Sequence, residues 1–290
     1  MFEAVQSQYL VPFDGSFNVG ESPTAPEDGP DKKKATNALR KRIKKMRHLQ
    51  DMLYAQNEWS VLLVFQAMDA AGKDGTIKAV MSGINPAGCQ VHSFKKPSEN
   101  ELDHDFLWRT TIRLPQRGQI GIFNRSYYEE VLVVRVHPKI LMGQQLPFIP
   151  PGDTVWDQRL KSIEDHELHL ARNGTVVLKF WLNVSKEEQR NRFLARIEEP
   201  EKNWKFHPAD VAERGHWDDY MLAYEETLQS TSRSWAPWYA IPADDKPYMR
   251  LAVADVIVRS LESLGLAYPS VSATERAELR MWGHELETEE

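Results

Sequence analysis

Residues 64–77 combine side chains and backbone features that could hold phosphate. They read VFQAMDAAGKDGTI, in which an apolar run leads into small residues and a helical pattern follows. Gly72 allows the backbone to approach phosphate oxygens closely, and the amides at a helix N-terminus would point toward the anion. Lys73 adds a compact positive charge at the same point. The segment predicts a phosphate-binding loop; the alternative is a structural turn with a surface lysine.

This loop departs from the motif G-x-x-x-x-G-K-[ST]. Ala67 occupies the first glycine position, and Asp74 stands where the Mg²⁺-binding hydroxyl should be. Thr76 comes two residues later, after Gly75. A carboxylate inside a phosphate loop is repelled by its ligand unless a divalent cation lies between them. We therefore expect Asp69 to be a Mg²⁺ ligand, the alternative being a solvated turn aspartate.

A second group of polar residues follows another apolar run. Residues 119–131 read QIGIFNRSYYEEV, so Asn124 and Arg125 come at the end of a predicted strand. Ligands of open α/β sheets bind outside the carboxyl ends of the strands, which would bring Asn124 beside the phosphate loop. Arg125 can bind two phosphate oxygens at once. Glu129, about one turn further, can be a second metal ligand or orient an acceptor; the alternative is a local pair with Arg125.

These residues need a scaffold of alternating strands and helices. Long helical patterns at 154–172, 185–199 and 247–264 lie between nearly continuous apolar runs. Such runs are typical of parallel strands covered on both faces. With helices as crossovers they predict an α/β fold, a three-layer α/β/α sandwich with a parallel sheet. The predicted strands are residues 61–66, 90–94, 119–124, 175–183 and 239–242.

The two ends of the chain differ from this pattern. Residues 1–30 are rich in Gly, Pro, Ser and acidic residues, and we expect an extended or mobile arm. Residues 31–50 predict an amphipathic helix with a basic outer face, which is either an ordinary solvated surface or an electropositive flank for a polyanion. Residues 269–290 are predicted to be a tail, frayed over the acidic stretch 284–290.

Composition narrows the class of protein. The 290 residues include 36 basic and 42 acidic side chains, and the net charge of −6 argues against a nucleic-acid coat protein. No apolar stretch is long enough to span a membrane, and no secretory signal precedes the first predicted elements. The single cysteine, Cys89, cannot form an internal disulfide or a Cys-rich zinc site. We expect a cytoplasmic protein without nucleic-acid or membrane partners, which must meet any anionic substrate with a local basic surface.

The two polar motifs resemble those of a known family. Residues 67–76, AMDAAGKDGT, and residues 123–129, FNRSYYE, are similar to the two nucleotide-binding motifs of the polyphosphate kinase 2 family. In much of that family an aspartate begins the second motif and an asparagine follows its aromatic pair. Asn124 and Glu129 stand at those places, which resembles the class III subgroup that phosphorylates AMP as well as ADP. Further matching segments are LWR at 107–109, WKF at 204–206, WDDY at 217–220 and APWY at 236–239.

The resemblance covers about residues 35–265 and implies a fold, a reaction and an assembly. The fold is a P-loop kinase domain similar to thymidylate kinase at 31–268, with a helical lid at about 185–206. The alternative for that lid is a surface helix with Glu–Arg pairs. The reaction is phosphoryl transfer from inorganic polyphosphate to the adenine nucleotides AMP and ADP, with Mg²⁺, or Mn²⁺ as its substitute. The implied assembly is a homodimer or homotetramer.

The expected mechanism is direct transfer without a covalent enzyme intermediate. Asp69 and Glu129 would hold Mg²⁺, while Lys73 and Arg125 would balance the charge on the transferring group. The candidates for a polyphosphate channel are Lys95, Lys96, Arg109, Arg113 and Arg117. The predicted substrate-binding residues are Ala70, Gly72, Gly75, Thr76, Arg109, Arg113, Asn124, Arg192, Arg196 and Lys205.

Two other functions remain open at this point. One is an ATP-dependent nucleotide kinase of the same fold, which would not accept polyphosphate as its donor. The other is a non-catalytic protein that binds polyanions through the basic helix at 32–47. Polyphosphate and AMP as sole substrates distinguish the first alternative from the predicted enzyme, and Asp69→Asn distinguishes the second.

Overall fold

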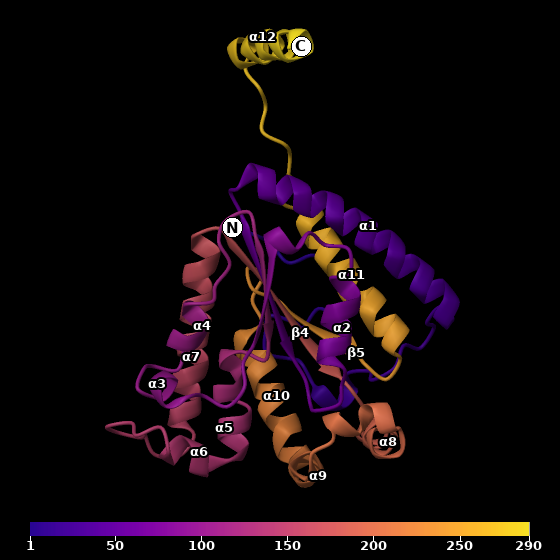
Figure 1. Cartoon of the computed structure of the whole chain (residues 1–290). Coiled ribbons are helices and arrows are strands. Elements are labelled where there is room, and N and C mark those ends of the chain that lie inside the picture. Colours follow the sequence, from indigo (N-terminus) through magenta and orange to yellow (C-terminus); the bar gives the residue numbers. More distant parts are fainter. Residues whose placement is uncertain (290) are drawn as a thin grey trace.

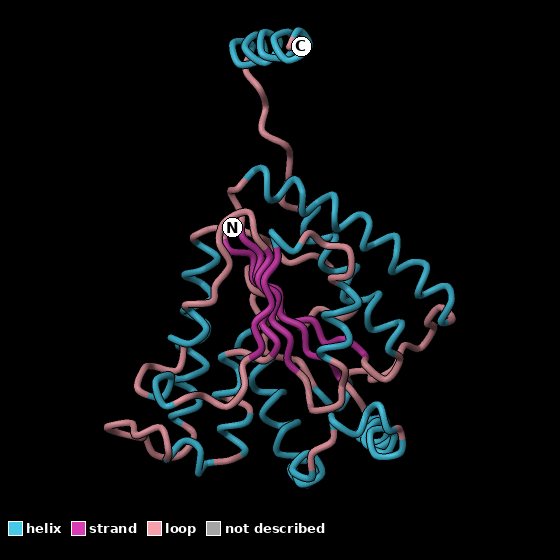
Figure 2. Tube along the Cα trace, viewed as in Figure 1, coloured by secondary structure: helices cyan, strands magenta, loops and turns pink. Residues whose placement is uncertain are grey.

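The structure, a computed structural model, describes residues 1–289 and contains one five-stranded parallel sheet. The strands are β1 (Ser60–Gln66), β2 (Cys89–Ser93), β3 (Ile120–Asn124), β4 (Thr175–Asn183) and β5 (Trp238–Pro242). Their order in the sheet is β2-β3-β1-β4-β5, and every neighbouring pair is parallel. The strands lie side by side at the centre of the domain (Figure 2). β1 and β4 are buried almost throughout, as their continuous apolar runs predict. All five predicted strands are confirmed.

Helices cover both faces of the sheet, which confirms the predicted three-layer α/β/α sandwich. The helices α1 (Lys32–Gln56), α2 (Lys73–Val80) and α11 (Lys246–Glu262) lie on one side of the sheet, and α7 (Thr154–Arg172) and α10 (Trp217–Thr231) lie on the other (Figure 1). Parallel strands need such crossover helices, so the order of elements along the chain dictates the layers. The remaining helices of this domain are α3 (Glu99–Leu102), α4 (Trp108–Thr111), α5 (Val133–Val136), α6 (Pro138–Met142), α8 (Lys186–Glu198) and α9 (Pro208–Glu213).

The register of the sheet brings the two polar motifs together. β1 and β3 are adjacent, and Phe65 of β1 pairs with Asn124 of β3. The loop that follows β1 and the residues that follow β3 therefore emerge at the same edge of the sheet. This edge is the one at which α/β proteins of this type bind ligands.

The first residues of the chain are packed against the sheet, which corrects the expected mobile arm. Phe2 and Val11 are buried in the core. The Val11 amide donates to the Trp238 carbonyl at 3.0 Å, and the Ala240 amide donates to the Tyr9 carbonyl at 2.8 Å. β5 is the edge strand, so its outer backbone groups need partners that the N-terminal segment supplies. Composition predicted the extended shape but could not reveal this pairing.

The C-terminal region contains a helix where the sequence predicts a tail with a frayed end. Helix α12 (Ala273–Thr288) begins with a capping box formed by Ser272 and Glu275, and it stands apart from the sheet and its helical layers (Figure 1). The predicted frayed stretch 284–290 is helical up to Thr288, and residue 290 lies outside the described part of the chain. Within residues 1–289, no helix has the length and apolar character needed to cross a bilayer.

Candidate active site

The loop between β1 and α2 adopts the tight backbone that a phosphate-binding loop requires. Ala70 and Gly72 both have positive φ angles, 61° and 109°. An angle of 109° is favourable only for glycine, which explains why Gly72 precedes the helix. The loop therefore turns sharply into α2 and leaves the first amides of that helix facing the edge of the sheet.

Lys73 is the first residue of α2 and is buried behind this loop. Its ammonium group donates to the carbonyl of Ala67 at 2.6 Å and to that of Met68 at 3.4 Å. Burial, together with the positive charge of the nearby Arg125, lowers the pKa of Lys73 to about 8. An anion bound at the loop would raise this pKa again and so favour the charged form of Lys73.

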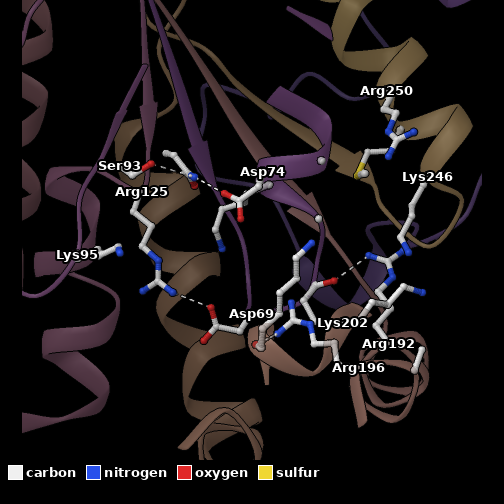
Figure 3. A pocket seen from close by; sticks show the side chains of 18 of the residues that line it. Asp69, Asp74, Ser93, Lys95, Arg125, Arg192, Arg196, Lys202, Lys246 and Arg250 are labelled. Atoms are coloured by element: carbon white, nitrogen blue, oxygen red, sulfur yellow. Dashed lines mark hydrogen bonds and ion pairs between the residues drawn. The ribbon is translucent and has the colours of Figure 1, made fainter. Parts of the chain in front are cut away.

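Arg125 links the two motifs through its guanidinium group. Nη2 donates to the Asp69 carboxylate at 2.6 Å (Figure 3), and Nη1 donates to the Glu129 carboxylate at 3.1 Å. Glu129 also accepts a hydrogen bond from the Gln66 amide at 3.0 Å. The two carboxylates raise the pKa of Arg125, with Glu129 the larger influence. Asp69 and Glu129 therefore approach one centre, and the Arg125–Glu129 pair considered as an alternative is present.

Arg125 has a strained backbone that its surroundings hold in place. Its φ angle is 63°, which is costly for a residue with a side chain, and its amide donates to the Phe65 carbonyl at 3.0 Å. Two residues later, the Tyr127 and Tyr128 hydroxyls donate to the buried Glu167 carboxylate at 2.8 and 2.9 Å. The aromatic pair of the second motif is thus an anchor in the core.

The Glu167 carboxylate is in turn paired with a buried lysine. Lys179 of β4 is fully buried, and its ammonium group donates to Glu167 at 2.5 Å and to the Thr231 carbonyl at 2.7 Å. Burial lowers the pKa of Lys179 to about 8, although Glu167 favours its charged form. This pair fixes the segment that carries Arg125 and Glu129 to β4 and α10.

A cavity of about 740 Å³ opens at this edge of the sheet (Figure 3). Its walls come from the phosphate loop, the ends of β2 and β3, helix α8, the 3₁₀ helix η4 (Pro200–Lys205) and the start of α11. Two acidic residues, Asp69 and Asp74, face many cations, so the cavity attracts a polyanion. The lining cations are Lys73, Lys95, Lys96, Arg125, Arg192, Arg196, Lys202, Lys205, Lys246 and Arg250.

A smaller cavity of about 250 Å³ adjoins the first, because Asp69 and Arg125 line both. Its character differs from that of the large cavity. Burial raises the pKa of the Tyr220 hydroxyl and that of the Asp210 carboxyl, which both line this cavity. Apart from Gln189, the further lining residues are apolar, aromatic or acidic, and include Met68, Leu132, Val133, Tyr224, Glu129 and Glu213.

Most of the predicted site residues meet at these two cavities. Asn124 lies at the junction of the motifs, where its amide donates to the Asp74 carboxylate at 2.5 Å and to the Ser93 hydroxyl at 3.4 Å. Glu129 lines the small cavity. The predicted residues that line the large cavity are Asp69, Ala70, Gly72, Lys73, Gly75, Lys95, Lys96, Asn124, Arg125, Arg192, Arg196 and Lys205.

Three predicted substrate-binding residues do not line either cavity. Thr76 is buried, and its hydroxyl donates to the Gly72 carbonyl at 3.0 Å. Arg109 lies over the Phe94 ring and donates to the Lys95 carbonyl at 2.7 Å, so it supports the cavity wall from behind. Arg113 lies beyond the end of α4, which stops at Thr111, and it lines neither cavity. Spacing alone could not show these positions.

Arg192 is at the cavity, but its guanidinium group is already bound to backbone carbonyls. It donates to Ala70 at 3.1 Å and Ala71 at 2.5 Å in the phosphate loop, and to the carbonyls of residues 243–244 at 2.6 and 3.1 Å. Its Nε donates to Glu188 at 2.7 Å. Arg192 therefore lines the large cavity as expected and also holds the phosphate loop in position, while its direct contact with substrate stays a prediction.

Arg196, the second predicted lid arginine, holds the segments that follow α8. Its guanidinium group donates to the Lys205 carbonyl at 3.2 Å and to the Asp210 carboxylate at 3.3 Å. Three cavity cations were absent from the predicted site, namely Lys202, Lys246 and Arg250. The signal for the last two was available, because residues 246–250 follow the carboxyl end of the last predicted strand.

The carboxylates fit a divalent cation that draws its other ligands from a substrate. Within residues 1–289, no group of three His, Cys, Asp or Glu side chains could hold a metal ion. Asp69 and Glu129 supply two carboxylates that converge on Arg125. Mg²⁺ commonly takes one or two protein carboxylates and completes its shell with water and phosphate oxygens. The two residues are therefore sufficient for a Mg²⁺ ion that is bound together with phosphate.

Comparison with known proteins gives relatives over most of the chain. The family profile described as Polyphosphate kinase 2 (PPK2) matches residues 29–266. The ADP-polyphosphate phosphotransferase of Rhodopseudomonas palustris is 59% identical over 242 residues, which cover 83% of this chain and 84% of that protein. The AMP/ADP-polyphosphate phosphotransferase of Meiothermus ruber is 44% identical over 266 residues, covering 90% and 95%.

A solved structure gives the same result for the fold. The crystal structure of Polyphosphate Kinase 2 from Arthrobacter aurescens TC1 superposes with a TM-score of 0.83 at 34% sequence identity. The match covers 96% of this chain and 99% of that one. The sheet and both helical layers are therefore common to the two proteins.

Proposed function

Since this chain belongs to the polyphosphate kinase 2 family, we propose that it transfers the terminal phosphoryl group of inorganic polyphosphate to ADP and AMP, giving ATP and ADP. One observation carries the proposal: the phosphate loop opens into a large cavity lined by lysine and arginine from several separate segments. A polymer with a charge on every phosphate needs such a surface, because an isolated loop lysine would not offset its repulsion from Asp69 and Asp74.

Two features support AMP as an acceptor beside ADP. The resemblance to the AMP-phosphorylating subgroup is based on two motif positions, which Asn124 and Glu129 occupy. The relative from Meiothermus ruber, 44% identical over 90% of this chain, is named for both acceptors, whereas the one from Rhodopseudomonas palustris is named for ADP. We therefore propose both acceptors.

The donor and the acceptor occupy different cavities. Polyphosphate lies in the large cavity, between the cations that follow β2 and those of η4 and α11. The nucleoside part of the acceptor lies in the small cavity, whose apolar and aromatic side chains suit a base and a ribose better than a polyanion. Asp69 and Arg125 line both cavities, so the terminal phosphoryl group and the acceptor phosphate meet there.

At this junction the protein aligns the two substrates and balances their charge. Phosphoryl transfer has a loose transition state, in which charge spreads over the equatorial oxygens of the transferring group. The Lys73 ammonium and the Arg125 guanidinium offset that charge, and each such group contributes roughly 10²–10³ to the rate. The acceptor phosphate oxygen attacks, and the shortened polyphosphate leaves with the electron pair of the broken bond. No covalent intermediate on the enzyme is required.

Polyphosphate kinases generally use a divalent metal ion. For this chain we propose Mg²⁺, with Mn²⁺ as a substitute, held by the carboxylates of Asp69 and Glu129. When bound, the ion neutralises phosphate oxygens of both polyanions, whose encounter is otherwise repulsive. Arg125, which bonds both carboxylates, then becomes available to phosphate oxygens.

We also propose that residues 185–206 act as a lid, although not as one rigid arm. Lys202 and Lys205 line the large cavity, which supports movement of η4 onto bound polyphosphate. Arg192 holds the first half of α8 to the phosphate loop, so the part that closes lies beyond it. Closure would exclude water and suppress hydrolysis of the donor.

The proposal is tested by a chromatographic time course of the purified protein with AMP, Mg²⁺ and long-chain polyphosphate. ADP and then ATP should form, and omission of polyphosphate should stop the reaction. No product with polyphosphate, together with turnover when ATP is the donor, would indicate an ATP-dependent nucleotide kinase instead. Assembly into a homodimer or homotetramer and a cytoplasmic location stay predictions, and light scattering of the purified protein measures the former.

A further inference from the structure

The outer side of α1 carries a row of exposed cations with no acidic partner. We call Lys33, Arg40, Lys44 and Arg47 the α1 basic face. Their spacings of seven, four and three residues place them along one side of the helix. Three cations on other sides of α1 are paired: Lys34 with Asp31, Arg42 with Asp255 of α11, and Lys45 with Glu262. In the described chain none of the four residues of the α1 basic face forms an ion pair.

The first turn of α1 begins beside the rim of the large cavity. Gly29, just before the helix, packs against Tyr248 of α11: a Cβ on this glycine would lie 3.3 Å from Cδ2 of that ring. Lys246 and Arg250, two residues to either side of Tyr248, line the large cavity. The start of α1 and the cations at that end of the cavity therefore occupy the same corner of the molecule.

A second contact shows which side of α1 faces the turn that follows α2. Ile43 approaches Gly83, just beyond α2: a Cβ on this glycine would lie 3.5 Å from Cγ2 of Ile43. Arg40 and Arg47 are three residues before and four residues after Ile43, so they flank this contact. Arg40 and Arg47 of the α1 basic face therefore lie near the loop that follows α2, the helix that begins at the phosphate loop.

Cations also occupy the surface between the cavity and α1. Arg250 lies close to Gly75 of α2, where a Cβ would be 3.5 Å from its Nη2. Lys78, one turn after Asp74, is exposed on α2. Asp74 itself accepts a hydrogen bond from Asn124 and so faces β3. Positive charge therefore extends from the cavity over α2 to the α1 basic face, which ends where Asp51 follows Arg47 by one turn.

We propose that the α1 basic face binds the part of a long polyphosphate chain that extends out of the cavity. This inference rests on the proposed function and adds a dependence on chain length. From residue 33 to residue 47 the helix rises about 21 Å at 1.5 Å per residue, so the face offers a track well outside the site of transfer. A short chain that ends inside the cavity cannot reach it, whereas a long chain gains several additional ion pairs.

The test compares two variants that remove the same charge. R40Q/K44Q/R47Q neutralises three residues of the α1 basic face, and K139Q/R172Q/R280Q removes three exposed cations that line neither cavity. The KM is measured with saturating ADP for long-chain polyphosphate and for a short oligophosphate, both as concentrations of chain ends. Three exposed ion pairs predict that the first variant raises the long-chain KM about tenfold. Its kcat and its short-chain KM should equal those of the control, and added salt should shrink the difference.

Two results would overturn the proposal. One is an equal change of KM for long and short chains, or no change for either. The other is loss of single-stranded DNA binding in R40Q/K44Q/R47Q with an unaltered long-chain KM, which would assign the α1 basic face to nucleic acid. If the wild-type protein turns over neither chain, the proposed function fails separately. Calorimetric binding of long-chain polyphosphate to both variants then still decides whether the α1 basic face holds the polymer.

Discussion

Arg125 donates a 2.6 Å hydrogen bond to Asp69 at the junction of the two cavities, so the two motifs meet through one ion pair. Asp69 lies in the loop after β1, and Arg125 is the first residue after β3. Their approach follows from the pairing of Phe65 with Asn124 in adjacent strands. The charge that repels phosphate and the charge that attracts it thus lie side by side where the two cavities meet.

Asp69→Asn should abolish most turnover while leaving polyphosphate binding intact or tighter. The substitution removes a carboxylate that would hold the metal ion, and it also removes a negative charge from the large cavity. We expect kcat to fall by at least about 10², the scale for loss of one group that stabilises the transition state. Steady-state kinetics and calorimetric binding of polyphosphate measure the two effects.

Asp74→Asn is the matched control for this variant. Asp74 lines the same cavity, and its substitution by asparagine removes the same negative charge. The Asp74 carboxylate, however, accepts a hydrogen bond from Asn124 rather than from Arg125. A similar loss of kcat in both variants would contradict the role assigned to Asp69. Normal turnover of Asp69→Asn would exclude direct participation of its carboxylate.

The binding of polyphosphate should take up protons near pH 8 to 9. Lys73 has its pKa lowered to about 8 by burial, and a bound phosphate favours the ammonium form, so binding raises this pKa. The affinity should therefore fall as the pH rises above about 8. Calorimetry at pH 8.5 in two buffers of different ionisation enthalpy measures the uptake, and Lys73→Met should remove it. An enthalpy that does not depend on the buffer would contradict the prediction.

The lowered pKa values of Lys73 and Lys179 also predict how the stability of the free protein depends on pH. Both pKa values are lowered to about 8, below the usual 10.5 for lysine. Between these values the unfolded chain holds more protons than the folded one, so the free energy of unfolding should rise as the pH increases from about 8 to 10.5. Urea denaturation across this range, compared with the double variant Lys73→Met/Lys179→Met, isolates the two groups.

Arg192→Met should destabilise the protein and slow the reaction. Four carbonyls, two of them in the phosphate loop, lose their charged donor in a buried place. We expect a loss of about 3–5 kcal/mol, because removing one partner leaves buried polar groups unsatisfied. Exposed Arg190 on the same helix is the control, and Arg190→Met should change stability by less than about 0.5 kcal/mol. Equal melting temperatures for the two variants would contradict the positioning role of Arg192.

Lys179→Met should cost about 3–5 kcal/mol of stability, since it leaves the Glu167 carboxylate buried without a positive partner. A second change, Glu167→Gln, removes that charge and should restore much of the loss. Chemical denaturation of the single and double variants measures the difference. A double variant that is less stable than Lys179→Met alone would show that the tyrosine hydrogen bonds to Glu167 matter more than the ion pair.

The sequence by itself determined the architecture and the two motifs. Continuous apolar runs can be buried on both faces only in a parallel sheet with crossover helices, so the layers follow from local patterns. Small residues between a strand and a helix, together with Lys73, predicted the loop for the same local reason. The nearness of Asn124 to this loop followed from a general rule about strand ends. These features depend on neighbours in the chain or on the period of the pattern.

Tertiary structure decided which cations surround the cavity and what each of them contacts. Arg192 and Arg196 are both arginines, one turn apart on α8. Arg192 nevertheless bonds carbonyls of the phosphate loop, whereas Arg196 bonds the Asp210 carboxylate. Thr76 and Arg109 do not line the cavities because their side chains bond the carbonyls of Gly72 and Lys95, contacts that the spacing of the residues does not reveal. Residues 1–11 pack along β5 because an edge strand offers unpaired backbone groups. The composition of this segment could not predict that contact.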